Sequence, residues 1–166
     1  HPDFQSLAQF YAVGFDLSYP YRVAGGLQDN GSHMAYHTNI TGEPMPFEHW
    51  LRVGGGDGMY NEFDHCTGRY LYNESQFGPI SRLDLWTGER ESIRYDDADL
   101  RWNWNAPILV SSHDCDVVFH AANKLLRSDN RGEIWATSST PPSPPSTSRS
   151  WIRTSSGWAP MTGTCR

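Results

Sequence analysis

The sequence Tyr21-Arg22-Val23-Ala24 is the first of three short apolar stretches that recur at one fixed spacing. The second stretch is Tyr70-Leu71-Tyr72, and the third is Val117-Val118-Phe119. Within them, Val23, Leu71 and Phe119 lie 48 residues apart. The chain therefore repeats one sequence unit three times.

A strand-like segment that ends in an acidic residue precedes each of these stretches. The segments are residues 10–16, 50–64 and 107–114, and the pairs Phe15-Asp16 and Phe63-Asp64 again lie 48 residues apart. A repeat of roughly 40–50 residues with several short strands is typical of a β-propeller blade. We therefore expect an all-β fragment of a β-propeller over residues 1–135. About three four-stranded antiparallel blades should bury Val23, Leu71 and Phe119 at equivalent positions.

The composition fits a turn-rich β domain, with 37% hydrophobic and 19% charged residues, 15 Gly and 11 Pro. The net charge of −6 and the lack of a basic stripe argue against nucleic acid as a partner. No apolar run approaches the roughly 18 residues that a membrane span needs. Because propellers close with roughly 4–8 blades, we expect this chain to be part of a larger protein whose remaining blades complete the ring.

The three cysteines, Cys66, Cys115 and Cys165, lack the spacing of a zinc site or of a disulfide framework. Cys66 and Cys115 both fall in the acidic turns that precede a strand. We interpret them as ordinary turn residues, and we expect neither a bound metal nor a cofactor. No cellular compartment follows from them.

Residues 136–166 lose the strand pattern and are rich in Ser, Thr, Pro and Arg. One interpretation is a proline-rich linker, which would be disordered. Another interpretation is that this tail is translated out of frame. With suitable synonymous codons for residues 151–165, reading from the third base of the Trp151 codon gives an acidic turn, an apolar strand and a second turn, as the next blade would. Both interpretations place this tail outside the propeller.

The segment Ser128-Asp129-Asn130-Arg131-Gly132-Glu133-Ile134-Trp135 resembles the Asp-box, the S-x-D-x-G-x-T-W hairpin motif of sialidase-like propellers. Ser128, Gly132 and Trp135 match the motif, whereas Asn130 and Ile134 replace its Asp and Thr. Ser and Asn side chains bond turn amides, Gly takes a positive φ, and Trp packs between sheets. The resemblance therefore predicts a hairpin in the third repeat.

A wider resemblance is carried by residues 9–11 (QFY), 25–32 (GGLQDNGS), 54–58 (GGGDG), 81–84 (SRLD) and 104–108 (WNAPI). Over residues 8–135 the chain resembles a bacterial family of large propeller proteins, the sortilin-type or BNR/Asp-box "glycosyl hydrolases". The resemblance implies an exported protein, extracellular or periplasmic, that acts on or binds carbohydrate. The alternative is a non-catalytic, sortilin-like propeller that binds a peptide or a glycan, because fold does not fix function.

Asp29 and Asp57 are the candidate catalytic residues. Glycoside hydrolysis usually needs two carboxylates about 5–9.5 Å apart, and each of these residues follows a Gly-rich strand end where the backbone can approach a ligand. Alternatively, both side chains cap Asx-type turns. If they act as a pair, Asp29, Gln28 and Asp57 should share one rim, with the carboxyl groups within roughly 10 Å. Glu62 and Glu74 are further acids with no feature that favours them.

The candidate ligand-binding residues are Gln28 and three tryptophans, Trp50, Trp102 and Trp104. Trp102 and Trp104 would share one face of an expected strand, where indoles suit the apolar faces of sugars. The alternative is core packing between blades. The recurring acids, Asp16, Asp64 and Asp114, occur in every repeat, so we interpret them as structural turn residues.

Overall fold

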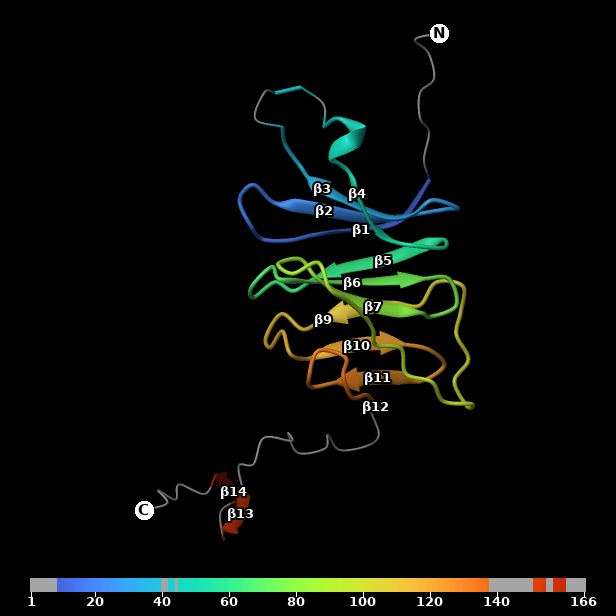
Figure 1. Cartoon of the computed structure of the whole chain (residues 1–166). Coiled ribbons are helices and arrows are strands. Elements are labelled where there is room, and N and C mark those ends of the chain that lie inside the picture. The colour runs from blue at the N-terminus through green and yellow to red at the C-terminus, as the bar shows by residue number, and fades with distance from the viewer. Residues whose placement is uncertain (1–8, 40–41, 44, 138–150, 155–156, 161–166) are drawn as a thin grey trace.

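The computed structural model describes residues 9–39, 42–43, 45–137, 151–154 and 157–160 (Figure 1). Within residues 9–137, three four-stranded antiparallel sheets follow one another along the chain and stack face to face like propeller blades. The predicted all-β fold with three four-stranded blades is confirmed, and the sheets do not close into a ring. No helix in the described part is long and apolar enough to cross a membrane.

The strands run in chain order through each sheet. The first sheet holds β1 (Phe10–Phe15), β2 (Arg22–Leu27), β3 (Gly31–Tyr36) and β4 (Leu51–Gly54), and the short 3-10 helix η1 (Phe47–His49) precedes β4. The second sheet holds β5 (Gly58–Phe63), β6 (Tyr70–Ser75), β7 (Ile80–Asp84) and β8 (Arg90–Ser92). The third sheet holds β9 (Ile108–Val110), β10 (Val118–Ala121), β11 (Leu125–Ser128) and β12 (Ala136–Thr137).

The 48-residue repeat reappears in the pairing of the strands. Phe15 pairs with Val23 in the first sheet as Phe63 pairs with Leu71 in the second. The register continues equally into the next strand of both sheets, through Val23 with Ala35 and Leu71 with Leu83. The first two sheets are thus built alike, whereas the third has a different register, in which Phe119 pairs with Leu109 and Arg127.

The predicted burial is correct only for the second sheet. Leu71 is fully buried, but Val23 and Phe119 are half-buried. The reason is that only the middle sheet of the three is covered on both faces. The position buried in all three sheets is the next residue, occupied by Ala24, Tyr72 and His120.

The two faces of the second sheet build two separate cores. One core lies between the first and second sheets and comprises Ala24, Met34, Val53, Phe63 and Leu71. The other lies between the second and third sheets and comprises Tyr72, Ile80, Ile93, Leu100, Ile108, Val110, Cys115, Val118, Leu126 and Trp135. Among the described residues, no helix covers either face of the second sheet, so its apolar side chains are buried against the neighbouring sheets.

Two glycines allow the first and second sheets to approach closely. A Cβ atom on Gly14 would lie 1.9 Å from the carbonyl oxygen of Asn61, and one on Gly26 would lie 2.2 Å from that of Met59. Only glycine fits at such contacts between backbones. The sequence of β1 and β2 therefore sets how near β5 can lie.

The recurring acidic residues cap turns, as predicted. Asp16 Oδ1 accepts hydrogen bonds from the backbone amides of Ser18 and Arg22. Asp64 Oδ1 accepts from the amides of Cys66 and Thr67, and Asp114 Oδ1 accepts from that of Asp116. These contacts are the mechanics of Asx turns.

The hairpin between β11 and β12 has the contacts that the Asp-box resemblance implies. Ser128 Oγ accepts the amide of Gly132 at 2.8 Å, and Asn130 Oδ1 accepts that of Ile134 at 2.8 Å. Gly132 has a φ of 90°. The indole of Trp135 donates to the carbonyl oxygen of Ile93 at 2.7 Å. The turn thereby ties the third sheet to the second.

The predicted boundary at residue 135 falls two residues short, because Ala136–Thr137 form the fourth strand of the third sheet. Farther along, β13 (Trp151–Thr154) and β14 (Gly157–Pro160) pair as a hairpin. The remaining residues of the tail, Cys165 among them, lie outside the described part of the chain. The out-of-frame interpretation stays a prediction.

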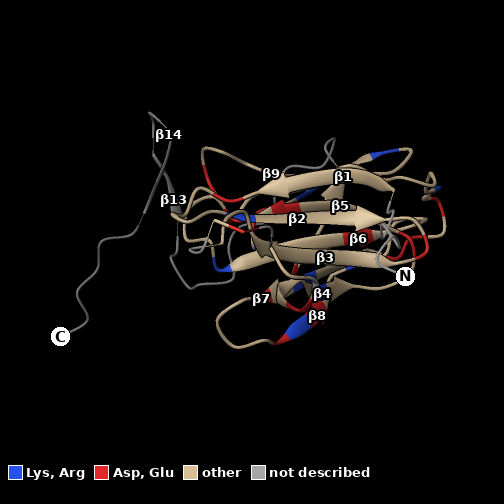
Figure 2. Cartoon of the chain, turned by 90° about the horizontal axis from the view of Figure 1, so that it is seen from above, with Lys and Arg blue, Asp and Glu red and all other residues tan. Residues whose placement is uncertain are grey.

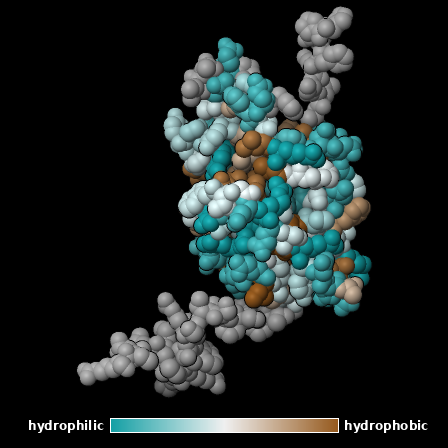
Figure 3. Space-filling model, in the orientation of Figure 1, coloured by the Kyte–Doolittle hydropathy of each residue, from teal (hydrophilic) through white to brown (hydrophobic). Residues whose placement is uncertain are grey.

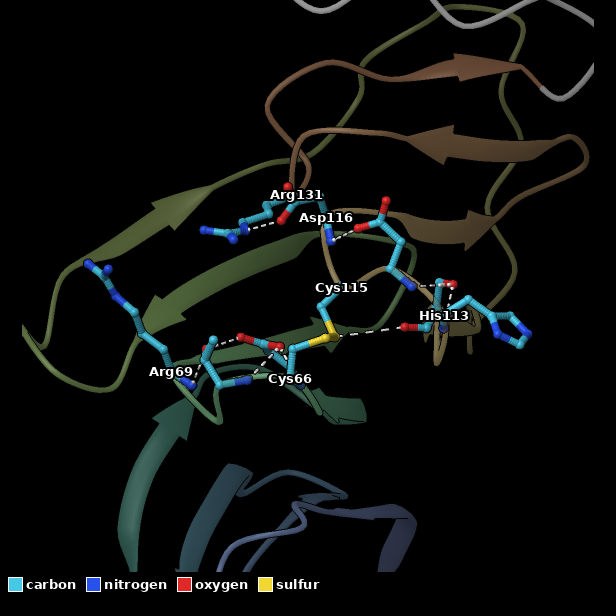
Figure 4. Close-up of a disulfide and its surroundings, with 10 residues drawn as sticks. Cys66, Arg69, His113, Cys115, Asp116 and Arg131 are labelled. Atoms are coloured by element: carbon cyan, nitrogen blue, oxygen red, sulfur yellow. Dashed lines mark hydrogen bonds and ion pairs between the residues drawn. A yellow bond between two sulfur atoms is a disulfide. The ribbon is translucent and has the colours of Figure 1, made fainter.

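A disulfide joins Cys66 to Cys115 across a sequence separation of 49, with the two Cα atoms 6.0 Å apart (Figure 4). The interpretation of these cysteines as ordinary turn residues is therefore wrong. Cys66 lies in the β5–β6 turn and Cys115 in the β9–β10 turn, which are equivalent positions of adjacent sheets. The disulfide locks the second sheet to the third at one end of the stack.

Removing this disulfide should destabilise the stack. For a loop of this length, the chain-entropy model gives a loss of about 4 kcal/mol on replacement of both cysteines. We expect the variant Cys66→Ser/Cys115→Ser to lose about 3–4 kcal/mol of unfolding free energy in urea, whereas Cys165→Ser should match the parent protein. Two free thiols at positions 66 and 115 in the oxidised protein would contradict the pairing.

Candidate ligand-binding rim

Four loops meet at the end of the stack opposite the disulfide. They are the β2–β3 turn (residues 28–30), the β4–β5 loop (55–57), the β6–β7 turn (76–79) and the last part of the β8–β9 loop (101–107). We call them together the Asp57 rim. All three sheets contribute to it, so its shape depends on how the sheets stack.

A chain of hydrogen bonds runs across the rim from sheet to sheet. Asp57 Oδ1 accepts the backbone amide of Asp29 at 2.5 Å, and the amide of Asp57 donates to Gln76 Oε1 at 2.8 Å. The amide of Gln76 donates back to the Asp57 carbonyl at 3.1 Å, and that of Phe77 donates to the Trp104 carbonyl at 3.2 Å. The four loops are therefore coupled to one another.

The two predicted catalytic residues lie together on this rim. Asp29 is exposed and has a φ of 61°, a strained backbone conformation that suits a turn. Asp57 is buried, and its carboxylate caps the turn that holds Asp29. Gln28 is exposed beside them. The turn-cap alternative thus accounts for the contact of Asp57, and the catalytic role of the pair stays a prediction.

An exposed pair of aromatic rings occupies the other half of the rim. Phe77 and Trp104 are 53% and 39% exposed, and their rings meet edge to face at 5.0 Å. Phe77 has a φ of 67° and Gly78 one of 85°, as in the tight hairpin turns that place both central residues in the left-handed region. A bulky residue in this conformation carries strain, which is often a sign of function.

The structure separates the three predicted tryptophans. Residues 101–107 form a loop rather than the expected strand, so Trp102 and Trp104 do not share a strand face. Trp102 is half-buried and packs on His120, with ring centroids 4.5 Å apart. Trp50 directly precedes β4, whereas the rim lies beyond the end of that strand. Of the three, Trp104 is the exposed one on the rim.

Sequence reasoning overlooked Phe77. The sequence does contain an indication of its role, in the segment Gln76-Phe77-Gly78-Pro79. Gly and Pro predict a turn there, and Phe77 is a large aromatic residue at the tip of that turn. An apolar ring in a surface turn gains nothing from core packing. Such a residue is a better candidate for ligand contact than a tryptophan in a strand.

Glu74 is buried beneath the rim and holds the Trp104 loop in place. Its Oε1 accepts the amide of Ala106 at 3.0 Å, and its Oε2 accepts that of Tyr60 at 3.5 Å. Burial raises the pKa of Glu74 to about 8. The carboxyl group is therefore mainly protonated at neutral pH. Burial also raises the pKa of Glu62, the other acid of the sequence prediction.

His120 provides a second buried titratable group, under Trp102. Burial lowers its pKa to about 4, with a further lowering by the charge of Arg94. The ring is therefore neutral at neutral pH and acts as part of the core between the second and third sheets. It lies between Trp102 and Trp135.

One group of side chains in the described part brings three possible metal-ligand atoms within 4.8 Å of one another, namely Asp64, Cys66 and Cys115. Both sulfur atoms are bonded to each other, and the Asp64 carboxylate accepts turn amides. Disulfide sulfur is not the thiolate that metals bind. The cluster is explained by the covalent link.

The chain matches no family model, and no curated protein matches it. The resemblance to Asp-box propeller proteins stays a prediction of the sequence. Function must therefore be inferred from the rim itself.

Ionisation of Glu74 should weaken the fold as the pH rises. Its pKa is higher in the folded than in the unfolded protein, so stability falls between about pH 4.5 and pH 8. His120 has the opposite effect below about pH 6.5. We therefore expect the unfolding free energy in urea to fall by about 1–2 kcal/mol from pH 6.5 to pH 8.

The variant Glu74→Gln should remove this fall. The exposed Glu89→Gln variant is the matched control and should retain it. A parent protein whose stability does not change over this range would contradict a buried, protonated Glu74.

Proposed function

We propose that this chain is a binding module of a blade-repeat protein and that the Asp57 rim binds carbohydrate without cleaving it. The observation that carries the proposal is the exposed Phe77–Trp104 pair, held on a hydrogen-bonded rim beside Gln28 and Asp29. Aromatic rings contact the apolar faces of sugar rings, while amide and carboxylate groups bond their hydroxyls. Both kinds of group lie on one rim.

The buried position of Asp57 favours binding over cleavage. A glycosidase pair needs two carboxyl groups that reach the scissile bond. Asp57 is 8% exposed, and its Oδ1 already accepts a hydrogen bond from the backbone amide of Asp29. Of the two predicted catalytic residues, Asp29 alone offers an exposed carboxylate to a ligand. A sortilin-like binding scaffold therefore fits the rim better than a hydrolase.

The disulfide supports the exported location implied by the family resemblance. Disulfides form and persist in oxidising compartments, such as the periplasm and the extracellular space. Cys66 and Cys115 link two sheets whose packing shapes the rim. An extracellular or periplasmic site of action is therefore part of the proposal.

Loss of either rim ring should weaken carbohydrate binding. We expect Phe77→Ala and Trp104→Ala each to weaken binding of neutral cello-, xylo- or manno-oligosaccharides by roughly tenfold, measured by calorimetry. Trp86→Ala is the control, because Trp86 is 69% exposed in the β7–β8 turn at the other end of the stack. Equal loss in the control, or no binding to any of these sugars, would contradict the proposal. Release of new reducing ends would show cleavage instead.

The outer face of the first sheet supports the proposal that another sheet of the same repeat type covers it. Val13 and Phe15 are 60% and 57% exposed there, and Figure 3 shows apolar surface at the level of this sheet. One repeat later, the first sheet covers Phe63 completely. Within this chain, the preceding sheet of the repeat is therefore what buries the position that Phe15 and Phe63 share.

Without that covering sheet, two copies of the chain should associate through this face. We expect concentration-dependent dimers in sedimentation experiments and a monomeric Val13→Lys variant, because a charge on the apolar face opposes its burial. Leu17→Lys, in the neighbouring turn, should still dimerise. A parent protein that is monomeric at about 100 µM would contradict the proposal, because that concentration far exceeds the Kd of an ordinary apolar interface.

A further inference from the structure

A pocket of about 120 Å³ lies between the end of the first sheet and the face of the second, and neither Phe77 nor Trp104 lines it. Its lining comprises Gly54, Gly55, Asn73, Glu74, Ser75, Pro79, Ile80, Ser81, Arg90 and Ser92. The volume corresponds to about four water molecules at roughly 30 Å³ each. This is enough for a small polar group and the atoms that carry it.

A row of polar side chains crosses the sheet beside this pocket, one from each strand. Asn61 pairs with Asn73, Asn73 with Ser81, and Ser81 with Ser92. Residues that are opposite one another in a sheet share a face, and Asn61 bonds Ser32 of the first sheet. The row therefore lies on a face that is otherwise apolar core. Core packing does not require polar side chains at these positions.

The side-chain amide of Asn73 has its orientation fixed and a donor to spare. Asn73 is 4% exposed, and its Oδ1 accepts from Ser81 Oγ at 2.8 Å and from Arg90 Nη1 at 3.3 Å. Because a guanidinium group only donates, the oxygen must face Arg90. Asn73 Nδ2 has no hydrogen-bond partner among the described residues. A buried donor of this kind costs free energy unless a partner binds it.

Arg90 brings a positive charge to the same pocket. Arg90 is exposed on β8, where Figure 2 shows a basic residue in blue, and it takes part in none of the ion pairs between described residues. Its neighbour Glu91 pairs with Arg82 at 2.7 Å instead. The pocket therefore combines a guanidinium group, an amide donor and three serine hydroxyls.

We propose that this pocket binds the carboxylate of an acidic sugar, a hexuronate residue of the glycan. A guanidinium group and an amide N–H are the donors that a carboxylate accepts. Glu74, which also lines the pocket, directs its carboxyl oxygens to the amides of Ala106 and Tyr60. At neutral pH it is mainly uncharged and does not repel an anion.

The choice of a sugar as the source of the carboxylate rests on the proposed function. Ser75 and Pro79 line the pocket and flank the turn that presents Phe77. One hairpin thus carries a wall of the pocket on its strands and an exposed ring at its tip. A glycan stacked on the ring would place a neighbouring residue near the pocket.

The test uses acetate, galacturonate and galactose at pH 6.5. We expect acetate and galacturonate to shift the NMR signals of the Asn73 side-chain amide, and galacturonate to bind at least tenfold more tightly than galactose. Arg90→Gln should remove this difference. Arg127→Gln, an exposed arginine of β11 outside both the pocket lining and the Asp57 rim, should retain it.

Each outcome separates this inference from the proposed function. Equal affinity for galacturonate and galactose, or unchanged Asn73 signals, would overturn the carboxylate pocket. If the protein binds galacturonate through Arg90 but binds no neutral oligosaccharide, the proposed carboxylate pocket stands and the proposed sugar binding by the aromatic rim is wrong. If Arg90 is needed to bind an acidic peptide and galacturonate does not bind, the proposal that a sugar supplies the carboxylate is wrong.

Discussion

In the described part of the chain, the three sheets bury their apolar side chains against one another rather than against helices, so a sheet face is core only where another sheet covers it. The second sheet meets this constraint on both faces and contains fully buried residues on each, such as Leu71 and Tyr72. The first and third sheets meet it on one face only. The same position in the repeat is therefore core in one sheet and surface in the next, as Phe63 and Phe15 show.

The close stacking also builds the Asp57 rim, because loops from three sheets must meet for the rim to exist. Gly14 and Gly26 bring the first two sheets into backbone contact, and this contact brings Asp57 within reach of the amide of Asp29. Glu74, on the second sheet, accepts a hydrogen bond from the amide of Ala106 and so fixes the Trp104 loop relative to that sheet. The geometry of the rim is thus a consequence of core packing rather than of the loops alone.

The spacing of 48 residues was sufficient to predict three blades, because strands and turns are local features that a repeat displays directly. It was not sufficient to predict burial at Val23 and Phe119, because burial depends on which sheets have neighbours. The Cys66–Cys115 pairing had a signal in the sequence, since the two residues lie one residue more than a repeat apart, in equivalent turns of adjacent sheets. The sequence contained no indication that Trp102 and Trp104 are separated, because both lie in an irregular loop.

The two ends of the stack differ in what holds them together. At one end, the disulfide joins the second and third sheets covalently, and Asp16 and Asp64 saturate the turns. At the other end, the sheets are joined by hydrogen bonds between loops, and the exposed ring of Phe77 is carried on a backbone with positive φ. A ring exposed on a strained backbone is unfavourable in the free protein, so contact with a ligand can recover free energy there. The end with the weaker links is the one suited to binding.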